Sequence, residues 1–164
     1  EVKGGGIDVL FYGSGNERRA EMGRRLDALA KAEGLVVRFI TQNSVMGDAR
    51  DDLVRRSKVV LNLHFYEDAA LEVHRISYLL AMGKCVLSEP SSDLFLDSQF
   101  ARGVCFARYD DVPAVLPLLL RNEPLRRDME ALARALASET QGDRRPLAEA
   151  LAGTVAALPR GPTP

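Results

Sequence analysis

The chain has 164 residues and a mass of 18.0 kDa, enough for one compact domain with a single core and too little for two ordinary domains. Hydrophobic residues make up 46% and charged residues 27%, a globular balance that excludes wholesale disorder, collagen-like repeats and a disulfide scaffold. The 22 basic and 23 acidic residues give a formal net charge of −1. Non-specific binding along a nucleic acid, which needs a basic surface, is therefore not expected, whereas a local phosphate pocket is compatible with this average.

No apolar stretch approaches the roughly 20 residues that a membrane helix needs, and the first residues lack the profile of a signal peptide. The two cysteines, Cys85 and Cys105, each lie in an apolar run and have no CxxC spacing. This pattern predicts small buried side chains and neither a zinc site nor a disulfide framework. We therefore expect a soluble, cytoplasmic protein without a bound metal.

The first two thirds of the chain alternate short apolar runs with helical segments. Residues Ile7–Tyr12 are apolar and bounded by glycines, as a buried strand would be. Asn16 is the expected N-cap of a helix that runs to about Glu33 and ends at Gly34. The other elements predicted here are a strand at Leu35–Ile40, a helix at Asp48–Arg56, a strand at Val59–Leu63, a helix at Glu72–Met82 ended by Gly83, and strands at Cys85–Leu87 and Val104–Ala107.

Strands separated by helices in this order predict a parallel sheet covered on both faces, that is, an α/β Rossmann-like three-layer sandwich of about five strands. After Ala107 the pattern is helical only, and the tail is expected to fray. We assign residues 1–140 to a Rossmann-like lobe and residues 141–164 to a C-terminal helix and tail. The helices expected in the last part of the chain are Asp111–Leu120, Leu125–Ala137 and Pro146–Leu158.

In open parallel sheets, ligands bind at the carboxyl ends of the strands. The residues expected there combine glycines, arginines, a histidine and carboxylates, a mixture that suits a ligand with both phosphate and hydroxyl groups. They are Gly13, Ser14 and Arg18 after the first strand, Thr41 and Gln42 after the second, His64, Tyr66 and Glu67 after the third, Ser88 and Glu89 after the fourth, and Arg108 and Tyr109 after the fifth.

The loop after the first strand, Gly13–Arg18, partly matches the dinucleotide fingerprint GxGxxG. Arg18 stands at the third glycine, and the second strand ends in Thr41-Gln42 without the acid that holds the ribose, which argues against NAD or FAD. The loop still offers N–H groups at a helix N-terminus beside Arg18 and Arg19, as an anion site does. The alternative is a tight turn with solvated arginines.

A second group of polar residues follows the third strand. Glu67 lies in the loop and Glu72 at the start of the next helix, where an acid also meets the helix dipole favourably. Arg75 is on the same helical face as Glu72, so the two either contact a ligand or form a surface ion pair. His64 could donate to a phosphate or sugar or be structural. The GxSxG and HExxH patterns of hydrolases and metalloenzymes are absent, as are the acids of a receiver domain.

Four ordered segments resemble one protein family. They are DVLFYGSGNERR (residues 8–19), ARDDLVRRSKVVLNLHFYE (49–67), EVHRISYLLAMGKCVLSE (72–89) and GVCFARYDDVPAVLPLLL (103–120), followed by the helical RNEPLRRDMEALA. Together they resemble the C-terminal, nucleotide-sugar-binding half of GT-B-fold glycosyltransferases, in the group 1-like branch that includes the spore-maturation glycosyltransferase-like proteins. The resemblance spans most of residues 7–137.

The resemblance implies a lobe that binds a nucleotide-diphosphate sugar and transfers the sugar together with an N-terminal acceptor-binding lobe, in the same or another chain. It places Arg18 or Arg19 against the diphosphate, and Glu67 and Glu72 against the ribose and sugar hydroxyls. Arginines and a helix N-terminus could neutralise the departing diphosphate without a metal or other cofactor. No catalytic residue is assigned, because the base of inverting members belongs to the acceptor lobe.

One position departs from the family pattern. The commonest form has a Glu five residues before the glycine that ends the helix, whereas counting back from Gly83 gives Tyr78. The ribose-binding role therefore falls to Glu72 or Glu67. The departure also favours a rival hypothesis, a non-catalytic Rossmann-like protein-interaction module. Under the leading hypothesis, the expected substrate-binding residues are Gly13, Ser14, Arg18, Arg19, His64, Glu67, Glu72 and Arg75.

Overall fold

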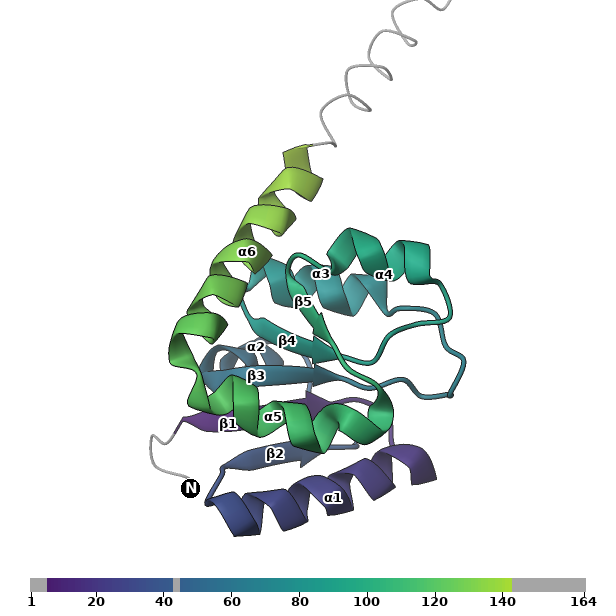
Figure 1. Ribbon diagram of the computed structural model, residues 1–164, viewed down its shortest axis with the longest axis vertical. Coiled ribbons are helices and arrows are strands. Elements are labelled where there is room, and N and C mark those ends of the chain that lie inside the picture. Colours follow the sequence, from purple (N-terminus) through teal and green to yellow (C-terminus); the bar gives the residue numbers. More distant parts are fainter. Residues whose placement is uncertain (1–5, 43–44, 143–164) are drawn as a thin grey trace, which may run out of the picture.

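The computed structural model describes residues 6–42 and 45–142, in which strands and helices alternate along the chain (Figure 1). The strands are β1 (Ile7–Tyr12), β2 (Val37–Ile40), β3 (Ser57–Asn62), β4 (Cys85–Ser88) and β5 (Val104–Phe106). The helices are α1 (Glu17–Glu33), α2 (Gly47–Arg56), α3 (Val73–Ala81), α4 (Leu94–Phe100), the short 3₁₀ helix η1 (Tyr109–Asp111), α5 (Val112–Arg121) and α6 (Glu123–Gly142).

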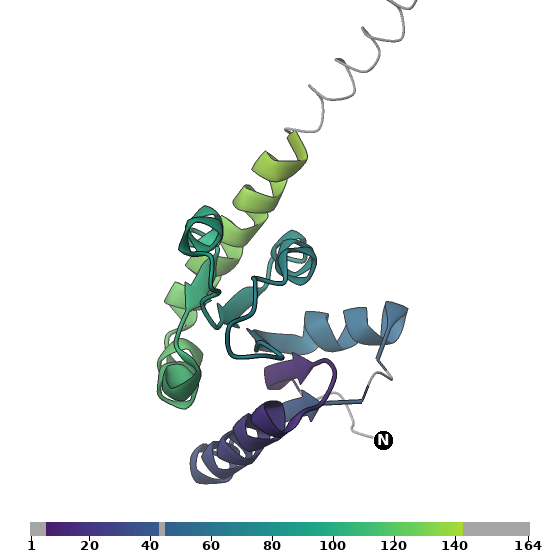
Figure 2. The ribbon, with the colours of Figure 1, turned by 90° about the vertical axis from the view of Figure 1, so that its right-hand side faces the viewer.

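The five strands form one parallel sheet in the order β2-β1-β3-β4-β5. The chain adds β2 on one side of β1 and β3 on the other, so the strand order reverses between β1 and β3. A crevice therefore opens outside the carboxyl ends of these two strands. Figure 2 looks onto this carboxyl edge. The predicted Rossmann-like α/β fold with a five-stranded parallel sheet is confirmed.

Helices cover both faces of the sheet, and each face has its own apolar cluster (Figure 2). Val9 and Phe11 of β1 pack on one face with α1 and α5, whereas Leu10 packs on the other face with α2 and α3. Because side chains alternate along a strand and both faces are buried, β1, β3 and β4 are nearly continuous apolar runs. Helix α6 joins the two layers, since Met129 packs against the first cluster and Ala133 belongs to the second.

The predicted ends of α1 are confirmed. Asn16 caps the helix, because its Oδ1 accepts a hydrogen bond from Arg19 N at 2.9 Å. Gly34 ends the helix in the left-handed conformation, with φ +67°. Strand β2 begins at Val37 and not at Leu35, because Leu35 N still donates to a carbonyl of the last helical turn.

Helix α4 was not predicted from the sequence. It has seven residues, too few for a helical period to stand out, and its N-cap Asp93 accepts a hydrogen bond from Leu96 N at 2.9 Å. Helix α6 is longer than expected and continues through residues 141 and 142. The predicted helix Pro146–Leu158 and the tail lie outside the described residues, and the boundary at 140/141 stays a prediction.

Two helix-ending glycines allow a matched test of backbone and packing effects. Gly34 and Gly83 have φ values of +67° and +63°, where a side chain is strained. A Cβ at Gly34 would meet no atom within 4 Å, whereas one at Gly83 would lie 2.9 Å from Arg134 Cγ. We predict that Gly34→Ala lowers the free energy of unfolding by about 1 kcal/mol and that Gly83→Ala lowers it more. Urea unfolding of the two variants measures this. Equal losses in the free energy of unfolding would show that the contact with Arg134 adds no cost at Gly83.

The buried core also predicts thiol reactivity. Cys85 is fully buried, and burial raises the pKa of its thiol to about 12. Cys105 is only half-buried, although burial raises its pKa too. Because the thiolate is the reactive form, iodoacetamide at pH 8 should label Cys105 first and Cys85 only upon unfolding. Mass spectrometry of the alkylated peptides measures the order of labelling. Fast labelling of Cys85 in the folded protein would contradict the burial of its thiol.

Candidate functional site

The crevice between β1 and β3 brings the predicted site residues to one edge of the sheet. Each comes from a segment that begins where a strand ends. Gly13 and Ser14 follow β1, Arg18 and Arg19 lie in the first turn of α1, His64 and Glu67 follow β3, and Glu72 and Arg75 lie at the start of α3.

Arg19 fills the base of the crevice and is only 3% exposed. Its Nη1 donates to Ser14 O at 2.8 Å, and its Nη2 donates to Leu63 O at 2.5 Å. The rings of Phe11 and Phe65 each lie 5.2 Å from its guanidinium carbon. Burial lowers the pKa of Arg19, but an arginine side chain still stays charged. Arg19 is therefore not the solvated side chain that the tight-turn alternative expects.

Glu72 joins two buried guanidinium groups. It occupies the N-cap position of α3, yet its side chain makes no capping hydrogen bond. Its carboxylate instead lies 3.3 Å from Arg19 Nη2 and 3.0 Å from Arg75 Nε. Arg75 also donates to Tyr12 O at 2.7 Å. Its side chain is 15% exposed and that of Glu72 is 38% exposed, so the expected ion pair between them forms and is partly buried.

The absence of a side chain at Gly13 makes room for these guanidinium groups. A Cβ at Gly13 would lie 3.2 Å from Arg75 Nη2 and 3.4 Å from Arg19 Nη1. Both distances are closer than ordinary van der Waals contact. A larger residue at this position would therefore push the two arginines away from the end of β1.

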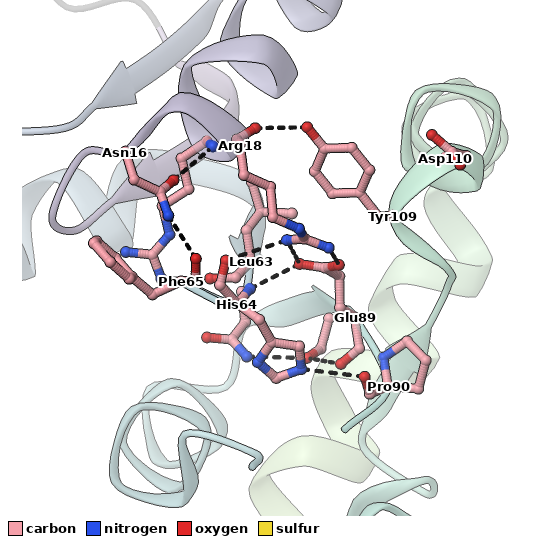
Figure 3. A network of polar contacts seen from close by, with 12 residues as sticks. Asn16, Arg18, Leu63, His64, Phe65, Glu89, Pro90, Tyr109 and Asp110 are labelled. Carbon is pink, nitrogen blue, oxygen red and sulfur yellow. Dashed lines mark hydrogen bonds and ion pairs between the residues drawn. The ribbon is translucent and has the colours of Figure 1, made fainter. Parts of the chain in front are cut away.

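Arg18 forms a bidentate ion pair with Glu89 (Figure 3), with 2.8 Å from Nη1 to Oε2 and a second contact from Nη2 to Oε1. Glu89 Oε2 also accepts a hydrogen bond from His64 N at 2.7 Å. The Tyr109 ring lies 4.1 Å from the Arg18 guanidinium carbon, and the Tyr109 hydroxyl donates to Arg18 O at 2.6 Å. Glu89 thus raises the pKa of Arg18 and connects α1 with the ends of β3 and β4.

Glu89 is not among the substrate-binding residues expected from the sequence, although its place directly after the fourth strand was recognised. Its carboxylate is 96% buried, which a sequence does not show. The sequence does contain one indication of its role. Glu89 is an acid that stands between the fourth strand and Pro90, at the edge of the sheet where Arg18 is also expected.

His64 is 1% exposed, and its ring Nε2 lies 3.2 Å from Pro90 O (Figure 3). With the proton on Nε2, the ring donates to this carbonyl and keeps only an acceptor at Nδ1. Nδ1 has no hydrogen-bond partner among the described residues. In this tautomer the ring has no donor left for a phosphate, which favours the structural alternative for His64.

The open part of the carboxyl edge is a hollow of about 460 Å³ beside Arg18, here called the carboxyl-edge hollow. Glu67 and Arg108 are both exposed, and within residues 6–42 and 45–142 neither side chain forms a hydrogen bond or an ion pair. Asp110, by contrast, pairs with Arg25 at 2.8 Å. The residues that line the hollow are Arg18, Glu67, Glu89, Pro90, Arg108, Tyr109 and Asp110.

A second, smaller hollow of about 360 Å³ lies at the end of β1. Tyr12, Gly13, Arg75 and the largely exposed Met46 are among the residues that line it. The carboxyl edge therefore offers two separate openings next to the crevice.

Tyr78, which stands where the family pattern has a Glu, joins α3 to α2. Its hydroxyl donates to Asp51 Oδ1 at 2.7 Å, and the guanidinium carbon of Arg50 lies 4.3 Å from its ring. Burial and the hydrogen bond with Asp51 raise the pKa of Tyr78 to about 12. Its contacts are therefore between two helices and do not involve the crevice.

No protein-family model and no curated protein matches the chain. Among the described residues, no group of three or more His, Cys, Asp and Glu side chains is arranged to hold a metal ion. No helix in the same residues is both long and apolar enough to cross a membrane. The fold is a Rossmann-like α/β domain, and function has to be argued from the site.

The ion pair at the site predicts a loss of stability. Glu89→Gln keeps the size of the side chain and removes the buried charge that Arg18 and His64 N contact. We expect the free energy of unfolding in urea to fall by about 1–3 kcal/mol, as for other buried charged groups that lose a partner. The matched control is Glu21→Gln, because Glu21 pairs with Arg24 and Arg25 on the surface of α1. An effect no larger than that of the control would show that the pair does not hold the site together.

Proposed function

We propose that this domain is the donor-binding lobe of a glycosyltransferase and holds a nucleotide-diphosphate sugar at the carboxyl edge of its sheet. The observation that carries the proposal is the carboxyl-edge hollow, in which cationic, acidic and aromatic side chains from α1 and from the segments after β3, β4 and β5 meet beside the topological switch point. The ordered resemblance to the nucleotide-sugar-binding half of GT-B enzymes supports the same substrate class.

The charges in the hollow nearly balance, which favours a sugar nucleotide over a bare phosphate. Arg18 and Arg108 face Glu67, Glu89 and Asp110, and Arg25 pairs with Asp110. An inorganic anion would be repelled by the free Glu67 carboxylate. A ligand with hydroxyl groups can instead donate hydrogen bonds to that carboxylate while its diphosphate contacts the arginines.

Arg108 and Arg18 have different roles in this proposal. Arg108 is exposed and its guanidinium has no partner within the described part of the chain, so it is free to contact the diphosphate. Arg18 is held by Glu89 and keeps a fixed positive charge at the wall of the hollow. Such preorganised charge is what a departing diphosphate needs as the glycosidic bond breaks.

Transfer also needs an acceptor. We propose that an acceptor-binding lobe, in the same or another chain, covers the carboxyl edge and supplies the catalytic base where the mechanism is inverting. Leu94 and Phe95 of α4 and Tyr66 of the loop between β3 and α3 are 74%, 77% and 72% exposed. A hydrogen bond from Ser92 N to Ala69 O at 3.2 Å links the loop before α4 to the loop that bears Tyr66. These exposed apolar side chains give such a lobe a surface to contact.

The same exposed side chains also favour the second candidate, a non-catalytic interaction module that contacts a partner protein. Tyr78 supports it as well, since the position of the family Glu is used to join two helices. The two candidates differ in one property, because only the glycosyltransferase lobe has to bind a sugar nucleotide.

Calorimetric titration of the full chain with UDP, GDP, UDP-glucose and GDP-mannose tests the proposal. We expect at least one sugar nucleotide to bind. Arg108→Ala should weaken that binding about tenfold, since a charge-assisted hydrogen bond is worth roughly 1.5–3 kcal/mol. Glu67→Gln should weaken it as well, because the ligand hydroxyls lose a charged acceptor.

The control is Arg24→Ala, which removes an arginine from the exposed face of α1 and should leave the affinity unchanged. If no member of the panel binds at millimolar concentration, the interaction module becomes the better hypothesis. If a sugar nucleotide binds equally well to Arg108→Ala, the carboxyl-edge hollow is not its site.

A further inference from the structure

A second charged hollow lies at the opposite, amino edge of the sheet. It measures about 300 Å³ and is lined by the end of α2, the start of β3 and the first turns of α6. Because β3 has six residues, this amino-edge hollow is about 20 Å from the carboxyl edge. Five basic side chains line it, namely Arg55, Arg56, Lys58, Arg126 and Arg127.

Positive charge is in excess around the amino-edge hollow. Among the residues that the structure describes, only two acids line it, Glu123 and Glu130. Two more lie next to it, Asp8 at 2.7 Å from Lys58 and Asp52 in the last turns of α2, and the cations still outnumber all four acids. The pKa of Glu123 is lowered by its hydrogen bond with Arg127, with a smaller contribution from Arg126 and Lys58. The carboxyl-edge hollow shows no comparable excess.

Two of the cations have unused donors. Arg126 is 92% buried, and its Nη1 donates to Leu119 O at 2.7 Å and to Leu120 O at the end of α5. Its Nε and Nη2 form no hydrogen bond within residues 6–42 and 45–142. The exposed side chain of Arg55 forms neither a hydrogen bond nor an ion pair within the same residues. Both side chains line the hollow.

Several of these cations are already held in place. Arg126 is fixed by two carbonyls, Lys58 by Asp8, and Arg127 by Glu123 at 2.7 Å. A ligand that contacts immobilised side chains loses less conformational entropy on binding than one that must order them. The planar fork of an arginine matches the oxygens of a phosphate group.

We propose that the amino-edge hollow binds a phosphate-bearing anion with two or more negative charges. Arg55 and the open side of Arg126 contact the phosphate oxygens, and Lys58 and Arg127 add positive potential. Because Arg55, Lys58 and Arg127 are exposed charges, the affinity falls as the ionic strength rises. This site is separate from the carboxyl-edge hollow and does not rest on the proposed function.

Calorimetric titration of the full chain with inorganic tripolyphosphate at low salt tests the proposal. We expect binding at a single site, a roughly tenfold loss of affinity in Arg55→Ala and a larger loss in Arg55→Glu. Because the exposed Arg55 side chain forms no hydrogen bond or ion pair with the described residues, these variants should fold as the parent does. Arg24→Ala is again the matched control and should bind as the parent does.

Three outcomes would overturn the proposal: no binding to the parent chain at millimolar tripolyphosphate, equal binding to Arg55→Glu, or binding lost in Arg108→Ala and kept in Arg55→Ala. The last outcome would instead place the anion in the carboxyl-edge hollow. Conversely, Arg55-dependent tripolyphosphate binding without any sugar-nucleotide binding would support this inference and count against the donor-binding role.

The same variants distinguish two sources of the phosphate group. The lipid arm uses vesicles of equal parts phosphatidic acid and phosphatidylcholine, because the phosphomonoester of phosphatidic acid can carry two negative charges. Co-sedimentation with these vesicles that is lost in Arg55→Glu and displaced by tripolyphosphate would identify a lipid headgroup as the ligand. Tripolyphosphate binding without vesicle binding would identify a soluble phosphate compound. Either result supports the site at Arg55.

Discussion

The buried guanidinium of Arg19 is the constraint on which the carboxyl edge depends. Where the strand order reverses, the chain leaves β1 and β3 in different directions, and the carbonyls of Ser14 and Leu63 have no strand partner there. Arg19 donates to both and lies between two aromatic rings. Burying this charge is costly, and Glu72 offsets part of the cost from the start of α3. Gly13 is needed beside it, because a side chain there would meet the guanidinium groups.

Pairing Arg19 with Glu72 and Arg18 with the buried Glu89 changes which residues can meet a ligand. The charges nearest to the crevice hold the loops in place, so recognition moves outward to exposed groups such as Arg108 and Glu67. The amino edge has the opposite arrangement, because its cations outnumber the nearby acids. Helix α6 packs against both apolar clusters and provides Arg126 and Arg127 to the amino edge. A formal charge of −1 therefore averages over two edges with different electrostatics.

Most of the fold could be predicted from the sequence because it depends on local patterns. The apolar run bounded by glycines corresponds to β1, and the apolar run at Val59–Leu63 corresponds to most of β3. Asn16 caps α1, and Gly34 and Gly83 end helices in the left-handed conformation. Errors occurred where distant groups decide the boundary. The third strand was expected to include Leu63, but it ends at Asn62, and the Leu63 carbonyl accepts a hydrogen bond from Arg19. Helix α4 was missed because seven residues are too few to show a period.

The sequence by itself determined that Gly13, Arg18, Arg19, Glu67 and Glu72 would reach one edge of a parallel sheet, because the carboxyl ends of parallel strands lie together. Only the tertiary structure decided the partners. It paired Arg18 with Glu89 and Arg19 with Glu72, gave the donor of His64 to Pro90 O, and left Arg108 and Glu67 exposed. It also brought Arg55 of α2 and Arg126 of α6 to one hollow, although 71 positions separate them in the chain. The physical reason is that pairing and burial depend on distances between segments, which residue order alone does not contain.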